Sequence, residues 1–178
     1  MTTRQAELSD APAIAAIYAH YVEDTSASFE LDAPTAGEYR ERMKEIQEFF
    51  PFHVCEDDGG VIGFAYAHAY HPRKAYQWIC ETSIYIKEGQ GRQGAGIALY
   101  SALLPELKKQ GFVQAMAIIA CPNEASEAFH EKMGFELLAT FPKMGYKFGE
   151  WHDVKYYKLD LNKAGDEVKD PVAFKYLI

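Results

Sequence analysis

The chain has few cysteines, a deficit of positive charge and no long apolar run. Its 178 residues include only three cysteines, Cys55, Cys80 and Cys121, without CxxC or Cys/His spacing for a metal. No stretch reaches the ~20 apolar residues of a membrane helix, and MTTRQAELSD lacks the apolar run of a secretory signal. We expect reduced core thiols, no metal site and a cytoplasmic location.

The charge balance also excludes partners. Lysine and arginine number 18 against 26 aspartates and glutamates, giving a net charge of −8. A phosphate backbone or an anionic membrane would be repelled, so neither nucleic acid nor membrane is an expected partner. A local basic pocket for a phosphorylated cofactor is not excluded.

Length and composition indicate one globular domain. Apolar residues make up 48% of the chain and charged residues 25%, which is ordinary for a folded domain. We assign the domain to residues 1–161. Residues 162–178, polar at first and apolar at the end, form a tail expected to dock on the body or on a partner.

Periodicity and turn signals predict a mixed α/β sheet. A helix is expected at residues 9–24, capped by Ser9 or Asp10, and a second begins at Thr35, which has capping-box spacing to Glu38. Further helices are expected from the Gly-rich loop to about residue 110, and from about residue 123 to 133. Strands are expected at residues 52–56, 61–70, 78–87, 114–120, 135–141 and 154–161.

A Gly-rich loop, EGQGRQGAG at residues 88–96, stands between a strand and a helix. Glycines let backbone N–H groups approach a phosphate, and the helix N-terminus adds a positive dipole end. No Gly-Lys-Ser/Thr follows, and the glycines do not have dinucleotide spacing. The pattern favours a pyrophosphate site, with a plain glycine turn as the alternative.

Three segments then make the sequence recognisable. They are ETSIYI at 81–86, GQGRQGAGIALY at 89–100 and CPNEASEAFHEKMGF at 121–135. They resemble the acetyl-CoA-binding core of the GNAT acetyltransferases, over about residues 4–161. SASFE at 26–30, HPRKAYQWICETSIYI at 71–86 and MGYKFGEWHDV at 144–154 are most similar to the phosphinothricin and methionine sulfoximine acetyltransferases.

The resemblance implies a twisted, mostly antiparallel sheet flanked by helices, with a splayed central strand pair that receives acetyl-CoA. The pantetheine arm is then expected on the strand at Ile84, Tyr85 and Ile86, and near Asn123 and Ser126. The implied pyrophosphate site is formed by Arg92, Gln93, Gly94, Ala95, Gly96 and Ile97. Gly91 departs from the family pattern, which has Arg or Gln at that place. Asn123 is equally well placed as a helix N-cap.

Glu81 is a carboxylate inside an otherwise apolar strand, where burial is costly without a function or a hydrogen bond. An edge or solvated position is the alternative. The resemblance implies that Glu81 is the general base that takes a proton from the amine.

His130 is the second candidate. A lone helical histidine is more often a surface or packed residue, but the resemblance places a proton-transferring group here. His130 then either protonates the coenzyme A sulfur or relays a proton from the amine.

A third cluster, His71, Arg73 and Tyr76, precedes Glu81. It is either a solvated loop or a clamp for an acceptor carboxylate, which an arginine fork matches. Phe29 is expected as an apolar wall, and Thr82 and Ser83 as further acceptor contacts. Trp151 either packs locally or lines a partner's pocket.

The sequence therefore predicts an acetyl-CoA-dependent N-acetyltransferase, acting by direct transfer to an amino acid-like amine. The resemblance also implies a homodimer. Two rival functions remain: acetylation of polyamines or protein N-termini, and CoA binding without catalysis.

Overall fold

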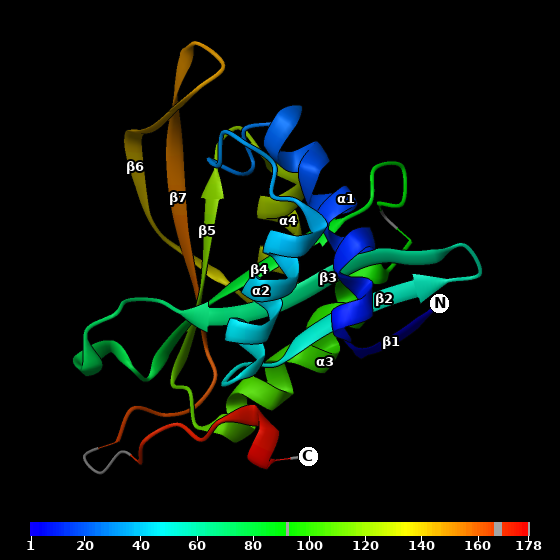
Figure 1. The fold of residues 1–178 in the computed structure, drawn as a ribbon. Coiled ribbons are helices and arrows are strands. Elements are labelled where there is room, and N and C mark those ends of the chain that lie inside the picture. The colour runs from blue at the N-terminus through cyan, green and yellow to red at the C-terminus, as the bar shows by residue number, and fades with distance from the viewer. Residues whose placement is uncertain (92, 166–168, 178) are drawn as a thin grey trace.

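The computed structural model describes residues 1–91, 93–165 and 169–177. Within them, seven strands form one sheet that four α-helices flank (Figure 1). The strands are β1 (Thr2–Gln5), β2 (Phe52–Asp57), β3 (Gly60–Ala69), β4 (Ile79–Ile86), β5 (Gln114–Ala120), β6 (Glu136–Lys147) and β7 (Glu150–Asp160). The helices are α1 (Ala11–Glu23), α2 (Ala36–Gln47), α3 (Ala95–Gln110) and α4 (Glu124–Lys132), with 3₁₀ turns η1 (Leu8–Asp10), η2 (Lys74–Tyr76) and η3 (Phe174–Tyr176).

The strand order is β1-β2-β3-β4-β5-β7-β6. Neighbouring strands are antiparallel except for β4 and β5, which are parallel. The prediction of a mixed, mostly antiparallel sheet is confirmed. Strand β1 was not predicted, because four residues with intermediate or exposed side chains carry no periodic signal.

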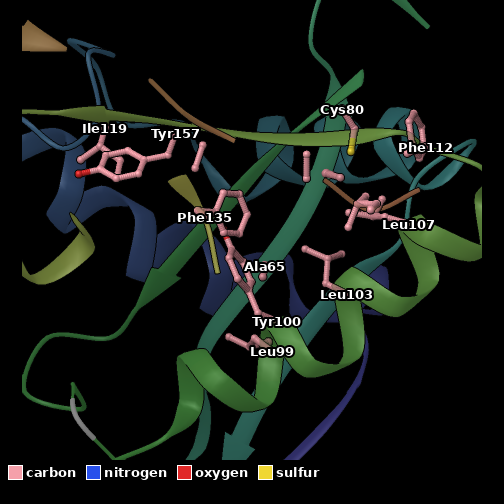
Figure 2. Close-up of a cluster of buried hydrophobic side chains, with 14 of the residues drawn as sticks. Ala65, Cys80, Leu99, Tyr100, Leu103, Leu107, Phe112, Ile119, Phe135 and Tyr157 are labelled. Carbon is pink, nitrogen blue, oxygen red and sulfur yellow. The ribbon is translucent and has the colours of Figure 1, made fainter. Parts of the chain in front are cut away.

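The sheet has a core on each face, because successive strand residues point to opposite sides. The core on one face contains residues of α1, α2 and the sheet: Ile14, Tyr18, Tyr39, Met43, Val54, Phe64 and Tyr66. The core on the other face contains residues of α3 and the sheet: Cys55, Ala65, Ala67, Cys80, Leu99, Tyr100, Leu103 and Leu107. Figure 2 shows the side chains of Leu99, Tyr100, Leu103 and Leu107 leaving α3 toward the sheet. Cys55 and Cys80 are buried free thiols, as expected.

Helix ends follow the local signals, with one correction. The capping box of α2 is present: Thr35 Oγ1 accepts from the amide of Glu38, and Glu38 accepts from the amide of Thr35 at 2.8 Å. Asp10 precedes α1, but its carboxylate does not cap that helix. It accepts instead from Arg4 and from the amide of Glu7, because η1 turns it back toward β1. Because η1 occupies Leu8–Asp10, helix α1 begins at Ala11 and not at about Ser9.

The C-terminal hairpin is longer than predicted. Strand β6 extends to Lys147 and β7 begins at Glu150, and the pair turns at Phe148 and Gly149, both with positive φ. Pro142 interrupts the sequence pattern, and the pairing register shifts between Phe141 and Gly145. Because β6 is an edge strand, it tolerates a proline that a central strand would not.

The end of the tail docks on the body (Figure 1). Phe174 is buried, and its amide donates to the carbonyl of Phe49. The fully buried Gln110 donates from Nε2 to the carbonyls of Phe49 and Val172, at 2.8 and 2.9 Å. Residues 169–177 therefore pack against α3 and the segment between α2 and β2.

Candidate active site

Strands β4 and β5 separate after a short stretch of pairing. Only Ile79, Cys80 and Glu81 pair with β5, the last of them with Met116. At the point of separation, the Thr82 hydroxyl donates to the Met116 carbonyl at 3.1 Å. The two diverging strands form walls of a cavity of about 850 Å³, closed further by α3, α4 and the segment after α1. The predicted splay is confirmed.

The N-terminus of α3 opens on this cavity. Gly94 adopts φ 91° directly before the helix, and Gly94, Gly96 and Ile97 line the cavity. A Cβ at Gly96 would lie 2.9 Å from the Phe129 ring, so glycine is needed for this close approach. The first N–H groups of a helix have no intrahelical acceptor and favour an anion. Gln93 and Ala95 do not line the cavity, and Arg92 lies outside the described residues.

The β4 wall differs in detail from the prediction. Ile84, Tyr85 and Ile86 all line the cavity, but Ile86 already has a partner for both backbone groups. The Tyr21 hydroxyl donates to its carbonyl at 2.6 Å and accepts from its amide at 3.2 Å. The Lys87 amide bonds to β3, so alternation directs the backbone of Tyr85 to β3 as well. Of these three residues, Ile84 alone has a backbone N–H and C=O that point into the gap between β4 and β5 and are free to bind a ligand there.

Asn123 and Ser126 lie at the start of α4 and line the cavity. The side-chain oxygen of Asn123 accepts from the Ser126 amide at 3.2 Å, so the N-cap interpretation is confirmed. Its position on the cavity leaves the predicted pantetheine contact possible at the same residue.

Glu81 lies on the cavity wall at the last paired position of β4, with 22% of its side chain exposed. Burial raises the pKa of Glu81, and the charge of His68 partly offsets the rise. His68 stands opposite Glu81 on β3, with its Nε2 atom 3.8 Å from the carboxylate. A partly desolvated carboxylate of raised pKa is a stronger base than an exposed one, provided it stays ionised.

His130 is buried between α4 and α3. Its Nδ1 lies 2.8 Å from the Ser126 carbonyl, and its Nε2 lies 3.0 Å from the Tyr100 hydroxyl. Burial lowers the pKa of His130, partly offset by the Ser126 carbonyl. The neutral ring is therefore favoured, with its proton on Nδ1, because a carbonyl can only accept.

His130 belongs to a network of hydrogen-bonded groups that has one more contact than it has protons to fill them. Tyr100 lies 3.1 Å from the Thr82 hydroxyl, which in turn reaches the Met116 carbonyl. Four links join His130, Tyr100 and Thr82 to each other and to two terminal carbonyls. Neutral His130, Tyr100 and Thr82 supply one proton each, which leaves one link unfilled. A proton added at Nε2 of His130 fills it.

The predicted acceptor contacts divide into two groups. Phe29, Thr82 and Ser83 line the cavity, whereas His71, Arg73 and Tyr76 do not. The His71 ring packs on Tyr76 with 4.6 Å between centroids, and the Arg73 amide donates to His71 Nδ1. Because the segment between β3 and β4 turns on itself, the clamp would require it to move toward the cavity.

Four residues near the site were missed from the sequence: Tyr21, His68, Tyr100 and Lys147. His68 had a readable signal, since antiparallel pairing of residues 61–70 with 78–87 sets it opposite Glu81. Tyr21 and Tyr100 belong to apolar helix faces, where a tyrosine is interpreted as a core residue.

Among the described helices, none has the length and apolarity needed to cross a bilayer.

Comparisons with known proteins agree with this geometry. A family profile described as "Acetyltransferase (GNAT) domain" matches residues 3–155. Phosphinothricin N-acetyltransferase of Streptomyces viridochromogenes is 35% identical over 157 residues, covering 88% of this chain and 86% of that protein. L-methionine sulfoximine/L-methionine sulfone acetyltransferase of Pseudomonas aeruginosa is 31% identical over 161 residues, covering 89% and 94%. The crystal structure of a phosphinothricin acetyltransferase from Sinorhizobium meliloti, in complex with acetyl-CoA, has a TM-score of 0.88 and 32% identity, covering 97% of each chain.

The chain belongs to the GNAT acetyltransferase family. It is an N-acetyltransferase, and its cosubstrate is acetyl-CoA. The residues present fit that group, because helix N–H groups, a glycine without room for a side chain and an open strand edge face one cavity.

Proposed function

We propose that the chain acetylates the α-amine of a small, amino acid-like acceptor by direct transfer from acetyl-CoA in a ternary complex. The observation that carries this proposal is a carboxylate of raised pKa in the same cavity as the amide-lined helix terminus. The relatives named for phosphinothricin and methionine sulfoximine support the acceptor class.

In this proposal, the N–H groups of Gly96 and Ile97 hold the pyrophosphate, and Ile84 and Asn123 hold the pantetheine arm. Bound acetyl-CoA supplies the thioester whose acetyl group is transferred. Glu81 accepts the ammonium proton of the acceptor, directly or through water, so that the nitrogen lone pair becomes available.

His130 acts as a proton relay and not as a resting acid. The neutral ring has a lone pair on Nε2. When Nε2 takes up a proton, the network around His130 gains one hydrogen bond. Both ends of this hydrogen-bonded network reach the cavity, one at Thr82 and the other at Ser126, whose hydroxyl lies 3.3 Å from Nδ1 of His130. We propose that the network takes up a proton released during acetyl transfer and returns one to the departing sulfur.

A thiol-release assay with a panel of amines tests the function. Phosphinothricin and methionine sulfoximine should react faster than matching amines without the carboxylate. If polyamines react faster than every amino acid, the acceptor class is wrong. If acetyl-CoA binds but no amine, peptide N-terminus included, is acetylated, the chain is a binding module.

Arg73→Ala tests the predicted clamp in the same assay. Loss of a charge-assisted contact should lower kcat/KM for the amino acid roughly 10- to 100-fold and spare the carboxylate-free amine. An equal effect on both acceptors would leave Arg73 outside acceptor recognition, with the amino acid proposal decided by the panel alone.

We also propose that the chain forms a homodimer through the β6–β7 hairpin, which extends beyond the body of the sheet (Figure 1). Its exposed apolar side chains are Leu137, Leu138, Phe141, Met144, Tyr146, Phe148 and Trp151. Trp151 is 58% exposed, with its ring 5.3 Å from that of Tyr146, so local packing leaves most of it uncovered. So many exposed apolar side chains on one hairpin are typical of an interface, and the mass in solution tests the proposal.

A further inference from the structure

One wall of the cavity has no regular secondary structure of its own. Ala27, Ser28 and Phe29 line the cavity just after α1 ends at Glu23. A wall in an irregular segment keeps its shape only if other elements hold it. Its contacts with β6, a strand more than 100 residues away in sequence, provide that hold.

Lys147 makes the first contact. Only 4% of this residue is exposed, and Nζ donates to the carbonyls of Val22, Thr25 and Ser28, at 2.6, 2.9 and 2.7 Å. Val22 lies in the last turn of α1, where carbonyls lack helical partners and a cation is favoured. All three ammonium protons are used, and all hold the same segment.

The wall is also held from the opposite side. The Ser28 hydroxyl lies 2.8 Å from that of Tyr18, and Tyr18 donates to Glu30, which pairs with Arg42 at 2.8 Å. Ser28 is thus fixed at its carbonyl by β6 and at its side chain by α1. The side chain of the next residue, Phe29, therefore projects from a backbone that Lys147 and Tyr18 hold through Ser28.

Gly145 makes the second contact with β6. A methyl group built on Gly145 would overlap the ring of Phe29, so the ring lies directly on the glycine backbone. Phe29 is still 40% exposed and lines the cavity. The absence of a side chain at Gly145 therefore sets how far the ring can withdraw from the cavity.

We propose that Lys147 and Gly145 are positioning residues that set the acceptor wall of the cavity, Lys147 through the backbone of Ser28 and Gly145 through the ring of Phe29. This inference rests on the proposed function, in which Phe29 faces the acceptor. It assigns specificity for the acceptor to the hairpin that we also propose as the dimer interface.

A double-mutant cycle of Gly145→Ala and Phe29→Ala tests it. Gly145→Ala should lower kcat/KM for the acceptor roughly 10- to 100-fold by displacing the ring, the range for a misplacement of about 1 Å. The Kd of acetyl-CoA should change less than about twofold. In the Phe29→Ala background the same substitution should have almost no effect, because the overlap is gone.

Lys147→Met, with Lys158→Met as its matched control, tests the backbone contacts. Lys158 lies on β7 and, among the residues that the structure describes, forms an ion pair with Asp160 alone, so its loss should leave the kinetics unchanged. Lys147→Met should raise KM for the acceptor and spare the Kd of acetyl-CoA. If this variant does not fold, Lys147→Arg takes its place, because it keeps the buried charge but not the three-donor ammonium geometry, and it should raise KM in the same way. An unchanged acceptor KM in a folded variant would overturn the role of Lys147, and the cycle above decides that of Gly145.

Three results would overturn the proposal. They are unchanged acceptor kinetics in Gly145→Ala, an equal loss of acetyl-CoA affinity, and a loss that persists in the Phe29→Ala background. A wild-type protein that acetylates no amine contradicts the proposed function instead. In that case, a crystal structure of Gly145→Ala decides this inference, which requires the Phe29 ring to shift.

Discussion

Glu81 has two properties that oppose each other. Its place at the end of the β4–β5 pairing excludes water and raises its pKa, which favours proton uptake from an amine. The same burial makes the ionised carboxylate costly to the fold. His68, 3.8 Å away, reduces that cost when it is charged. In the proposed mechanism, Glu81 therefore contributes to catalysis at the expense of stability.

Glu81→Gln should lower turnover by roughly 10²- to 10⁴-fold at neutral pH, because the amide cannot accept the amine proton. Activity of the variant should rise at high pH, where solvent deprotonates the acceptor. Acetyl-CoA affinity, measured by calorimetry, should stay unchanged. Near-normal turnover at pH 7 would remove Glu81 from the mechanism.

The same variant should be more stable than the wild type near pH 8, by about 0.5–2 kcal/mol. The folded pKa of Glu81 is raised, so the wild-type residue favours folding below its unfolded pKa of about 4.3 and loses that contribution as pH rises through the folded value. Denaturant unfolding of both proteins between about pH 4.5 and 8 should show a gap that widens with pH. A constant gap would mean that protonation is not its source.

Tyr100→Phe should lower the pKa of His130 further, because a buried imidazolium would lose the acceptor of its Nε2 proton. Turnover should fall roughly 10- to 100-fold if the relay operates. NMR titration of His130 gives the pKa directly. Tyr39→Phe, at an equally buried tyrosine outside the network, serves as the control. Unchanged turnover with a shifted pKa would contradict the relay.

The placement of Glu81 and His130 on the cavity could be predicted, Glu81 because it is a carboxylate in an otherwise apolar strand and His130 because its segment resembles that of the GNAT acetyltransferases. Their catalytic roles stay predictions. Tyr100 and Lys147 could not be predicted, since a tyrosine in an apolar helical stripe and a lysine in a late strand have ordinary explanations. The roles proposed for them depend on partners far away in sequence: Tyr100 contacts His130 30 residues later, and Lys147 contacts Val22 125 residues earlier. No local pattern encodes such pairs.

At the scale of elements, the helix ends and turns that depend on glycine or on a capping side chain were predicted best. The Gly-rich loop before α3, the Thr35 capping box and the end of α3 at residue 110, where Gly111 forms the C-cap, all appear as expected, because glycine conformation and capping act over a few residues. The length of the β6–β7 hairpin was underestimated, because the sequence around Pro142 does not alternate between apolar and polar residues and most of β6 is exposed.

The N-terminus of helix α3, which we propose as the pyrophosphate site, also packs closely on α4, where Gly96 lies against the Phe129 ring. Gly96→Asp should weaken acetyl-CoA binding at least roughly tenfold, equal to about 1.4 kcal/mol, since it adds bulk against Phe129 and negative charge beside the proposed pyrophosphate. Calorimetry measures the loss.

Gly96→Ala separates the two causes, because it adds the bulk without the charge. It should weaken binding less than Gly96→Asp. Equal affinities for the wild type and a folded Gly96→Asp variant would place the phosphates elsewhere.

At the scale of the whole molecule, the tail completes the α3 side of the fold. Beside the start of β4, the Lys169 carbonyl accepts from Trp78 and the Asp170 carboxylate accepts from Gln77. Phe174 is buried, with its amide bonded to the Phe49 carbonyl, to which Gln110 at the C-terminal end of α3 also donates. These contacts lie away from the residues that line the cavity. We therefore predict that the tail contributes to the stability of the domain and not to its chemistry.

Phe174→Ala should lower the free energy of unfolding by about 3 kcal/mol, the range for removing a buried aromatic ring, and turnover per folded site should stay within about twofold. Tyr176→Ala is the matched control, since Tyr176 belongs to the same 3₁₀ turn but is 73% exposed and should cost less than about 0.5 kcal/mol. Denaturant unfolding and active-site-normalised turnover measure the two effects separately. Truncation after Lys163 should repeat the Phe174→Ala result more strongly, because it also removes the partner of Gln110 at Val172. If either change lowered turnover while the unfolding midpoint stayed fixed, the tail would act on the site as a lid and not as part of the core.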